Sequence, residues 1–258
     1  MKGGLLVEIQ ERLIRVLRDQ TYLSYAQFSK GRVSAVKAAF DGDPDCDYAV
    51  SHIPDISYAQ VCPPIFFADI DGYAHRLMSC APRKKEHPIE YAVYLRGACI
   101  LILNFAGLDK ELVSRIRPSN IDFQSGIITI LDHEFSLSRY ASDIIKEFFD
   151  LPRAGNAKGE GYSAQVRPKT FLFSMKGDDP VKVGALNKAV RFTVDTAHER
   201  GFETSAWIAS VNGDFVRVRA LVESGCDEKE AIEKIAISRA RNLGAFIETY
   251  RAFQVQCP

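Results

Sequence analysis

The feature that most constrains this fold is an apolar run inside the segment from Tyr91 to Leu131. Its members fall on nearly every side of a helix, and they are Leu95, Ala98, Cys99, Ile100, Leu101, Ile102, Leu103 and Phe105. A helix that is hydrophobic all round has no face to turn toward water, so it lies inside a folded domain. We therefore expect a buried helix here, with the other elements arranged around it.

Turn and strand signals follow this helix directly. Ala106-Gly107 is expected to end it, because glycine tolerates the left-handed conformation found at helix C-termini. Residues 109–117 predict a short amphipathic helix that stops at Pro118. Residues 121–131 then predict a β-hairpin that turns around Gly126.

Helical periodicity accounts for most of the remaining chain. The expected helices span residues 5–17, 24–40, 65–77, 136–149, 184–200, 214–223, 228–237 and 242–253. Residues 170–173 predict a short apolar strand, and residues 152–167 an irregular excursion rich in glycine and charge. The expected fold class is therefore α+β, mainly α-helical with a small β-hairpin or sheet.

A charged segment that ends in proline, residues 83–88, has the composition of an interdomain linker. A chain of 258 residues is long enough for two modest domains, each with its own core. We expect a small helical domain over residues 1–82, the linker over 83–88, and a larger domain over 89–258.

The charge balance limits the kinds of partner. Lysine plus arginine and aspartate plus glutamate both number 33, so the formal net charge is +0. Proteins that bind duplex DNA usually carry a basic excess, because contacts to phosphates supply most of their affinity. Any DNA-binding face on this chain must therefore be a local patch.

Metal, cofactor and membrane signatures are missing from the sequence. The six cysteines form no C-x-x-C pair and the five histidines show no ligand spacing, so no metal site is expected. Nucleotide-binding and hydrolase motifs are absent as well, and no cofactor is expected. No signal peptide is recognised, and no apolar run reaches the roughly 20 residues of a membrane span. These observations predict a cytoplasmic protein without a membrane partner.

The order of elements resembles that of a known family. A buried helix, a break at Gly107-Leu108, a short helix and the pattern N-I-D-x-x-x-G-x-I-x-I over residues 120–130 are similar to the start of the catalytic domain of tyrosine recombinases, the phage-type integrases. The likeness extends by order of elements to Phe253, and more loosely over residues 1–80. It implies a tyrosine-recombinase-like catalytic domain preceded by a helical core-binding domain, with DNA as the partner.

Members of this family cut DNA with a tyrosine that attacks a phosphodiester, while two arginines hold the non-bridging oxygens. The resemblance places Asp109 at the first arginine position and Asp214 at the second. In the same H-x-x-R box, the histidine position holds Val211. Arg241 stands where the later histidine belongs, and Tyr250 stands where the nucleophile belongs.

These departures put cleavage in doubt. The hairpin, where the family has a lysine, offers Asp132-His133-Glu134 instead. Two aspartates in place of arginines put negative charge where a phosphate has to bind, and like charges about 4 Å apart repel by about 4 kcal/mol even at an effective dielectric of ~20. We therefore expect a phosphate pocket of inverted charge. Arg217 and Arg219 are two residues apart, so they point to different sides of their helix and are not expected to rebuild the pocket.

The resulting hypothesis is a catalytically inactive tyrosine-recombinase-like protein that binds double-stranded DNA. It would act as an accessory or regulatory factor in recombination or transcription, with a partner recombinase and on a mobile element. The candidate DNA-binding residues are Lys30, Arg32, Lys37, Lys188, Arg191, Arg217, Arg219, Arg239 and Arg241. Basic residues on helices also fit a second interpretation, as solvated faces without a ligand.

Two other functions stay open. Tyr250 lies between Ile247 and Phe253, which is typical of a packing residue, but a diverged active recombinase would use it as the nucleophile. A protein-interaction module that has kept the fold and lost DNA binding agrees with the neutral charge. The segment after Tyr250 is short, so at most weak self-association is expected.

Overall fold

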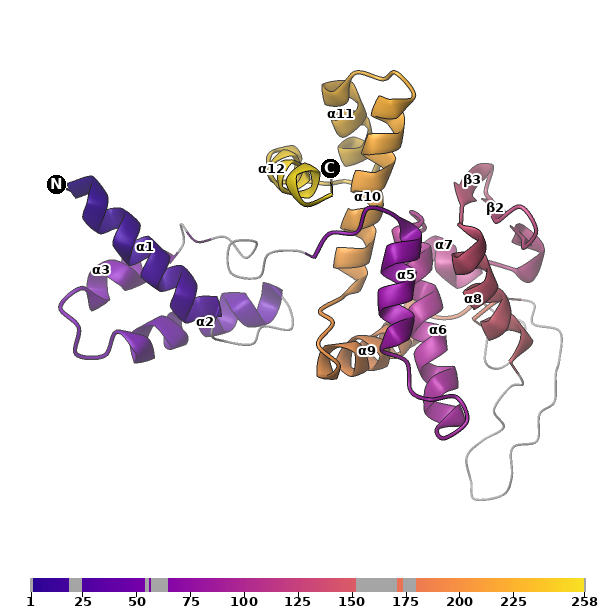
Figure 1. Cartoon of the computed structure of the whole chain (residues 1–258), viewed down its shortest axis with the longest axis horizontal. Coiled ribbons are helices and arrows are strands. Elements are labelled where there is room, and N and C mark those ends of the chain that lie inside the picture. The colour runs from indigo at the N-terminus through magenta and orange to yellow at the C-terminus, as the bar shows by residue number, and fades with distance from the viewer. Residues whose placement is uncertain are drawn as a thin grey trace. The chain divides into compact units, whose positions relative to one another are not determined.

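A computed structural model describes residues 2–18, 25–53, 56, 65–151, 171–173 and 180–257 of the chain. The chain divides into two compact units, Met1–Pro64 and Ile65–Pro258 (Figure 1). The described part is mainly α-helical and carries one small antiparallel sheet, which is the expected α+β class. Each unit is described by itself below.

The first unit contains helices α1 (Lys2–Arg18), α2 (Tyr25–Ala39) and α3 (Cys46–Ser51). Apolar side chains on the inner faces of these helices form a separate small core, with Leu13, Leu17 and Phe40 fully buried. The guanidinium of Arg12 lies 4.2 Å above the Phe40 ring and 2.7 Å from the Asp43 carboxylate. The acidic turn that follows Phe40 is therefore linked back to α1.

The second unit is built around α6 (Pro88–Phe105), as the apolar run predicts. Residues 97–105 of this helix are all buried. Other helices pack against it, chiefly α5 (Ile70–Ser79), α8 (Arg139–Asp150), α9 (Val183–Glu199) and α10 (Ala206–Glu223). Neighbours on several sides explain why this helix carries no polar stripe.

The segment after α6 forms a short helix and a three-stranded sheet. Helix α7 (Lys110–Arg115) is followed by a 3-10 turn (Pro118–Asn120) and by strands β1 (Ile121–Asp122), β2 (Ile127–Ile130) and β3 (His133–Ser136). The strands are antiparallel in the order β1-β2-β3, and Ile128 on β2 lies opposite Ile121 and Phe135. The predicted hairpin is confirmed, whereas the third strand was not expected.

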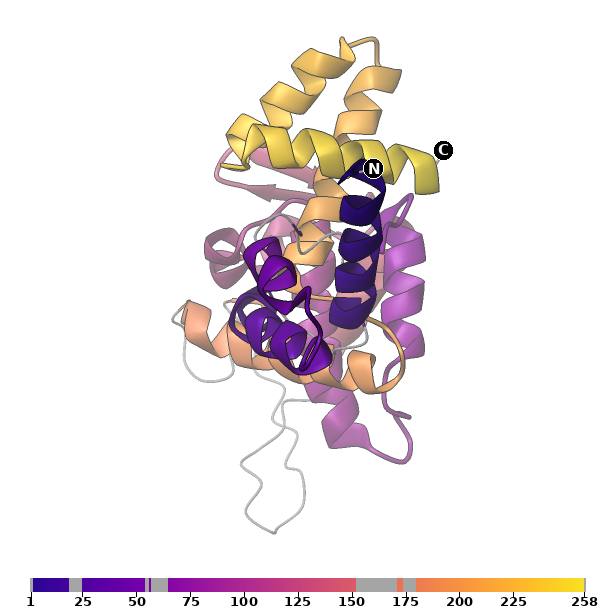
Figure 2. The same ribbon diagram turned by 90° about the vertical axis from the view of Figure 1, so that its left-hand side faces the viewer.

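Three helices at the end of the chain form a second core within this unit. Helices α10, α11 (Glu228–Ser238) and α12 (Leu243–Gln256) lie together at one end of the second unit (Figures 1 and 2). Phe215 is the centre of this core, since the rings of Phe246, Tyr250 and Phe253 lie 5.0 to 5.5 Å from its own. Predicted helix 214–223 begins earlier, at Ala206, where the Ser205 side chain caps it.

The division between units lies nearer the N-terminus than the expected linker at 83–88. Helix α5 belongs to the second unit because it packs on α6 and α8. The Tyr94 hydroxyl donates to the Leu77 carbonyl oxygen at 2.6 Å, and Lys84 in the expected linker pairs with Glu147 of α8. The charged composition of residues 83–88 thus marks an exposed connection inside a unit.

Two smaller expectations concern the segment before α9. Residues 171–173 form a bend instead of the predicted strand, and the Leu172 amide donates to the Ile116 carbonyl at 2.8 Å. The three apolar side chains are buried even so, because the bend covers the main core. The predicted excursion at 152–167 lies outside the described residues.

Candidate functional site

A close crossing of α6 and α10 lies beside a group of buried and partly buried charged side chains. A side chain at Gly213 on α10 would place its Cβ 1.7 Å from the Phe105 carbonyl oxygen, so the two backbones are nearly in contact. Gly107, directly after α6, has φ +107°, a conformation that suits glycine. The crossing brings the next turn of α10, with Asp214 and Arg217, to the C-terminal end of α6.

Asp214 is fully buried and accepts hydrogen bonds from arginines on two segments of the chain. Its Oδ2 accepts from Arg241 Nε at 2.9 Å and from Arg241 Nη2 at 2.7 Å. Its Oδ1 accepts from Arg217 Nη2, one turn along the same helix, and lies 3.3 Å from Arg239 Nε. Both carboxylate oxygens are therefore surrounded by guanidinium groups.

The guanidinium groups of these arginines also donate hydrogen bonds to backbone carbonyl oxygens and to a hydroxyl oxygen. Arg217 donates to the Phe105 carbonyl at 3.1 Å, and Arg239 to the Gly107 carbonyl at 3.0 Å. These carbonyls end helix α6, where the helix dipole favours positive charge. Arg239 and Arg241 also both donate to the Ser210 hydroxyl, at 2.9 and 2.7 Å. The arginines are thus held in place from two sides.

We call Arg217, Arg239 and Arg241 with Asp214 and Ser210 the arginine cluster. Three guanidiniums and one carboxylate leave it with a net charge of +2. Burial lowers the pKa of Arg217, and the nearby Asp214 carboxylate partly offsets this effect; arginine stays protonated in proteins even so. The arginine side chains are 29%, 20% and 19% exposed, whereas the Asp214 side chain is fully buried.

The expected inversion of charge at this position is wrong. Asp214 lies in the middle of α10 and not at the start of a helix, and Arg239 and Arg241 reach it from the turn between α11 and α12. In that turn Ala240 has a φ of +49°. The local spacing of residues does not predict such a turn. Arg217 and Arg219 were considered as substitutes for the missing arginines of the family pattern. Contact of three arginines with one aspartate was not predicted.

Arg219 points away from the cluster, as its two-residue spacing from Arg217 predicts. It donates to the Ala68 carbonyl at 3.0 Å and to the Cys257 carbonyl at 3.3 Å. Its guanidinium lies 4.8 Å above the Phe253 ring. The contacts of this arginine tie the C-terminal helix to the start of the second unit.

Tyr250 lies in the interior of the three-helix core. Its side chain is only 3% exposed, and its ring lies 5.5 Å from Phe215 and 5.8 Å from Phe253. Burial raises the pKa of its phenol, with the Glu228 carboxylate adding to the effect. A nucleophile needs the opposite, an accessible phenol that loses its proton readily.

The remaining positions implied by the family resemblance are occupied as follows. Asp109 is exposed and caps α7 by accepting a hydrogen bond from the Leu112 amide at 2.8 Å. His133 and Glu134 are exposed on β3, next to a turn where Leu131 and Asp132 both have positive φ. None of these side chains supplies the positive charge that the family pattern has there.

The other predicted DNA-binding residues lie on two helices. Lys188 and Arg191 are exposed on α9, where Arg191 lies 3.7 Å from Asp195. Lys30 and Lys37 are exposed on α2, and Arg32 on the same helix is partly buried. Helix α2 belongs to the first unit and α9 to the second.

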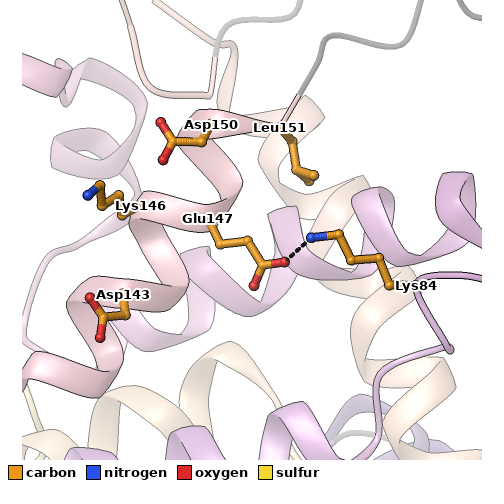
Figure 3. Close-up of a pocket in the computed structure, with 6 residues that line it drawn as sticks. All are labelled: Lys84, Asp143, Lys146, Glu147, Asp150 and Leu151. Carbon is orange, nitrogen blue, oxygen red and sulfur yellow. Dashed lines mark hydrogen bonds and ion pairs between the residues drawn. The ribbon is translucent and has the colours of Figure 1, made fainter.

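A shallow pocket of about 500 Å³ is found at a different place, beside the last turns of α8 (Figure 3). It is lined by Lys84, Asp143, Lys146, Glu147, Asp150 and Leu151. Glu147 lies 2.6 Å from Lys84 Nζ and accepts a hydrogen bond from the Tyr91 hydroxyl at 3.0 Å. Three acidic and two basic side chains make this pocket unsuited to an anion.

Two further features concern metal binding and membranes. Within the described ranges, no three histidine, cysteine, aspartate or glutamate side chains are grouped as a metal site requires. Helix α6 has the length and hydropathy of a membrane span, but 67% of that stretch is buried within the protein, as in the core helix of a globular domain.

Comparisons with known proteins give a distant structural likeness. No protein-family model matches the sequence, and no curated protein matches it. Among solved structures, the chain is similar to one described as the crystal structure of XerA recombinase. The TM-score is 0.42 and the identity 13%, over 95% of this chain and 77% of that one. With likeness at this level, the function has to be argued from the side chains themselves.

Proposed function

We propose that this chain is a tyrosine-recombinase-like protein that binds double-stranded DNA without cutting it, as an accessory or regulatory factor. The observation that carries the proposal is the arginine cluster, which combines a net charge of +2 with a buried aspartate; the family resemblance assigns that aspartate to the position of a catalytic arginine. The net positive charge of the cluster supports binding of a phosphate group. The aspartate at its centre argues against catalysis of phosphodiester cleavage.

Binding is supported by the way the guanidiniums are presented. Arg239 and Arg241 are anchored by Ser210, and Arg217 and Arg239 by carbonyl oxygens, so little side-chain freedom remains to be lost on binding. Each keeps between 19% and 29% of its side chain exposed. Arginines held in this way suit contact with a DNA phosphate.

The absence of cleavage is supported by three positions. Tyr250 is buried with a raised phenol pKa, so it is a poor nucleophile. Asp109 caps a helix, and Asp214 places a carboxylate among the arginines that would stabilise the transition state. Transition-state stabilisation of phosphoryl transfer depends on uncompensated positive charge at that point.

The test is a salt titration of binding to random-sequence duplex DNA. We expect micromolar affinity at low salt that falls steeply as salt rises, because each neutralised phosphate releases counterions. Arg241→Gln is expected to weaken binding and to reduce the salt slope by about 1. Arg251→Gln, at an exposed position on α12, is the matched control and is expected to leave the slope nearly unchanged. No binding by the folded wild type at low salt would refute the proposal.

A second candidate is a protein-interaction module without DNA binding, and the formal net charge of +0 favours it. It predicts the negative result of the same titration. The third reading, an active recombinase, predicts a covalent protein–DNA adduct on a nicked substrate that disappears in Tyr250→Phe. We expect no covalent adduct from the wild type or from Tyr250→Phe.

A further inference from the structure

We propose that the Asp214 carboxylate is a built-in anion that occupies the centre of the arginine cluster and competes there with phosphate. The inference rests on the proposed function, since it assigns a regulator to the same anion-binding site. It goes further by predicting that Asp214 greatly lowers the affinity of the arginine cluster for phosphate.

The hydrogen bonds around Asp214 have the form of an oxyanion site that is already filled. Arg241 donates two hydrogen bonds to Oδ2, while Arg217 donates one to Oδ1. Arg239 Nε lies 3.3 Å from Oδ1 without a well-aligned hydrogen bond, and no other described group satisfies this nitrogen. Three guanidiniums therefore converge on two oxygens, an arrangement in which a phosphate oxygen pair would serve equally well.

The carboxylate has an advantage over any dissolved anion because it is attached to the site. It is carried on a rigid turn of α10 whose backbone is pressed against α6 at Gly213. Its effective concentration is therefore high, and binding it costs no translational entropy. A dissolved phosphate can still bind the exposed edges of the arginines, but the +2 charge that attracts it is one unit lower than it would be without Asp214.

The decisive variant is Asp214→Asn, which keeps the shape of the side chain and removes its charge. The probe is inorganic phosphate, titrated calorimetrically and by thermal unfolding at constant ionic strength balanced with sodium chloride. The control is Asp195→Asn on α9, which removes the same charge from an exposed ion pair with Arg191. We expect at least tenfold tighter phosphate binding in Asp214→Asn than in either the wild type or Asp195→Asn.

A folded Asp214→Asn that binds phosphate no better than Asp195→Asn would overturn the inference. Phosphate also stabilises folded proteins without binding a site, so only the difference between the two variants counts. Adding Arg241→Gln to Asp214→Asn is expected to cancel the gain, and a gain that persists in the double variant would likewise overturn the inference.

Loss of Asp214 is also able to prevent folding, and the test then uses refolding. Asp214→Asn is refolded in phosphate and in chloride of equal ionic strength. Recovery of the helical circular dichroism in phosphate alone supports the inference, because the dissolved anion then replaces the missing carboxylate. Equal failure, or equal recovery, in the two salts would overturn it.

The outcome is separable from that of the proposed function. If the wild type binds no DNA while Asp214→Asn gains phosphate affinity, the proposed function falls and the built-in anion stands. If the wild type binds DNA while Asp214→Asn gains nothing, DNA binding stands and Asp214 is a purely structural residue.

Discussion

Asp214 and Arg241 are 27 residues apart in the sequence, and two hydrogen bonds of 2.9 and 2.7 Å join them in the fold. The pair fixes the turn before α12 to the middle of α10. Arg239, two residues earlier on that turn, donates a hydrogen bond to the carbonyl oxygen of Gly107, which follows the C-terminal end of α6. The junction therefore links the end of the main core to the three-helix core, and its removal has consequences for stability.

Asp214→Ala is expected to destabilise the chain by about 3 kcal/mol, because it leaves partly buried guanidiniums facing one another without a counter-ion. Asp195→Ala removes an aspartate whose side chain is 52% exposed, and it is expected to cost less than about 1 kcal/mol. Urea unfolding followed by circular dichroism measures both. Equal midpoints for the two variants would show that the cluster contributes little to folding.

Gly213→Ala is expected to destabilise by about 1–3 kcal/mol or more, because the new methyl group collides with the Phe105 carbonyl oxygen at 1.7 Å. Gly184→Ala, in the first turn of α9, is the matched control. A Cβ at Gly184 meets nothing within 4 Å, and alanine favours a helix by up to about 1 kcal/mol. Thermal unfolding should therefore shift in opposite directions for the two substitutions. A stabilised Gly213→Ala would contradict the close crossing.

The parts of this fold that could be predicted from the sequence are those set by local patterns. Helix α6 was predictable because its apolar residues occupy every side, and the β1–β2 hairpin because Gly126 and alternating isoleucines define it. Strand β3 was missed because its turn places two non-glycine residues, Leu131 and Asp132, at positive φ. Such turns usually carry Asn-Gly or Asp-Gly, and Leu131-Asp132 lacks that signature.

The site was less predictable than the fold for a physical reason. Position in the sequence placed Asp214 and Arg217 on one helix, and Arg239 and Arg241 were candidate DNA-binding residues, but no local pattern predicted that these two would contact Asp214. Those two arrive through the Ala240 turn and through packing of α11 on α10. A buried carboxylate is paired with positive charge in a folded protein. The burial of Asp214 therefore requires positive partners, and arginines distant in the sequence supply them.

Alkaline pH is expected to reveal two core tyrosines. The Tyr94 hydroxyl donates to the Leu77 carbonyl, and the Tyr73 hydroxyl is paired with Thr204 at 2.9 Å. Burial raises the pKa of both phenols above the ordinary value of about 10. The folded state thus keeps protons that the unfolded chain releases, so this stability is complete below about pH 10 and is lost as the pH rises further.

A titration of phenolate absorbance measures this effect. We expect part of the signal from the ten tyrosines to appear only when the helical circular dichroism is lost. Tyr73→Phe should reduce that late step. Reversible ionisation of all ten tyrosines near pH 10 in a folded protein would contradict the burial of Tyr73 and Tyr94.

Arg191 and Arg219 provide a contrast between binding and packing. Both were expected to contact DNA, yet the Arg191 side chain is 84% exposed, whereas Arg219 binds two carbonyl oxygens and covers the Phe253 ring. Arg191→Gln is therefore expected to reduce the salt slope of DNA binding by about 1, with stability unchanged within about 0.5 kcal/mol. Arg219→Gln is expected to cost about 1–3 kcal/mol of stability and to leave the slope unchanged. DNA titrations at several salt concentrations, run beside urea unfolding, separate the two roles, and equal effects on the slope would assign both arginines to the DNA-binding face.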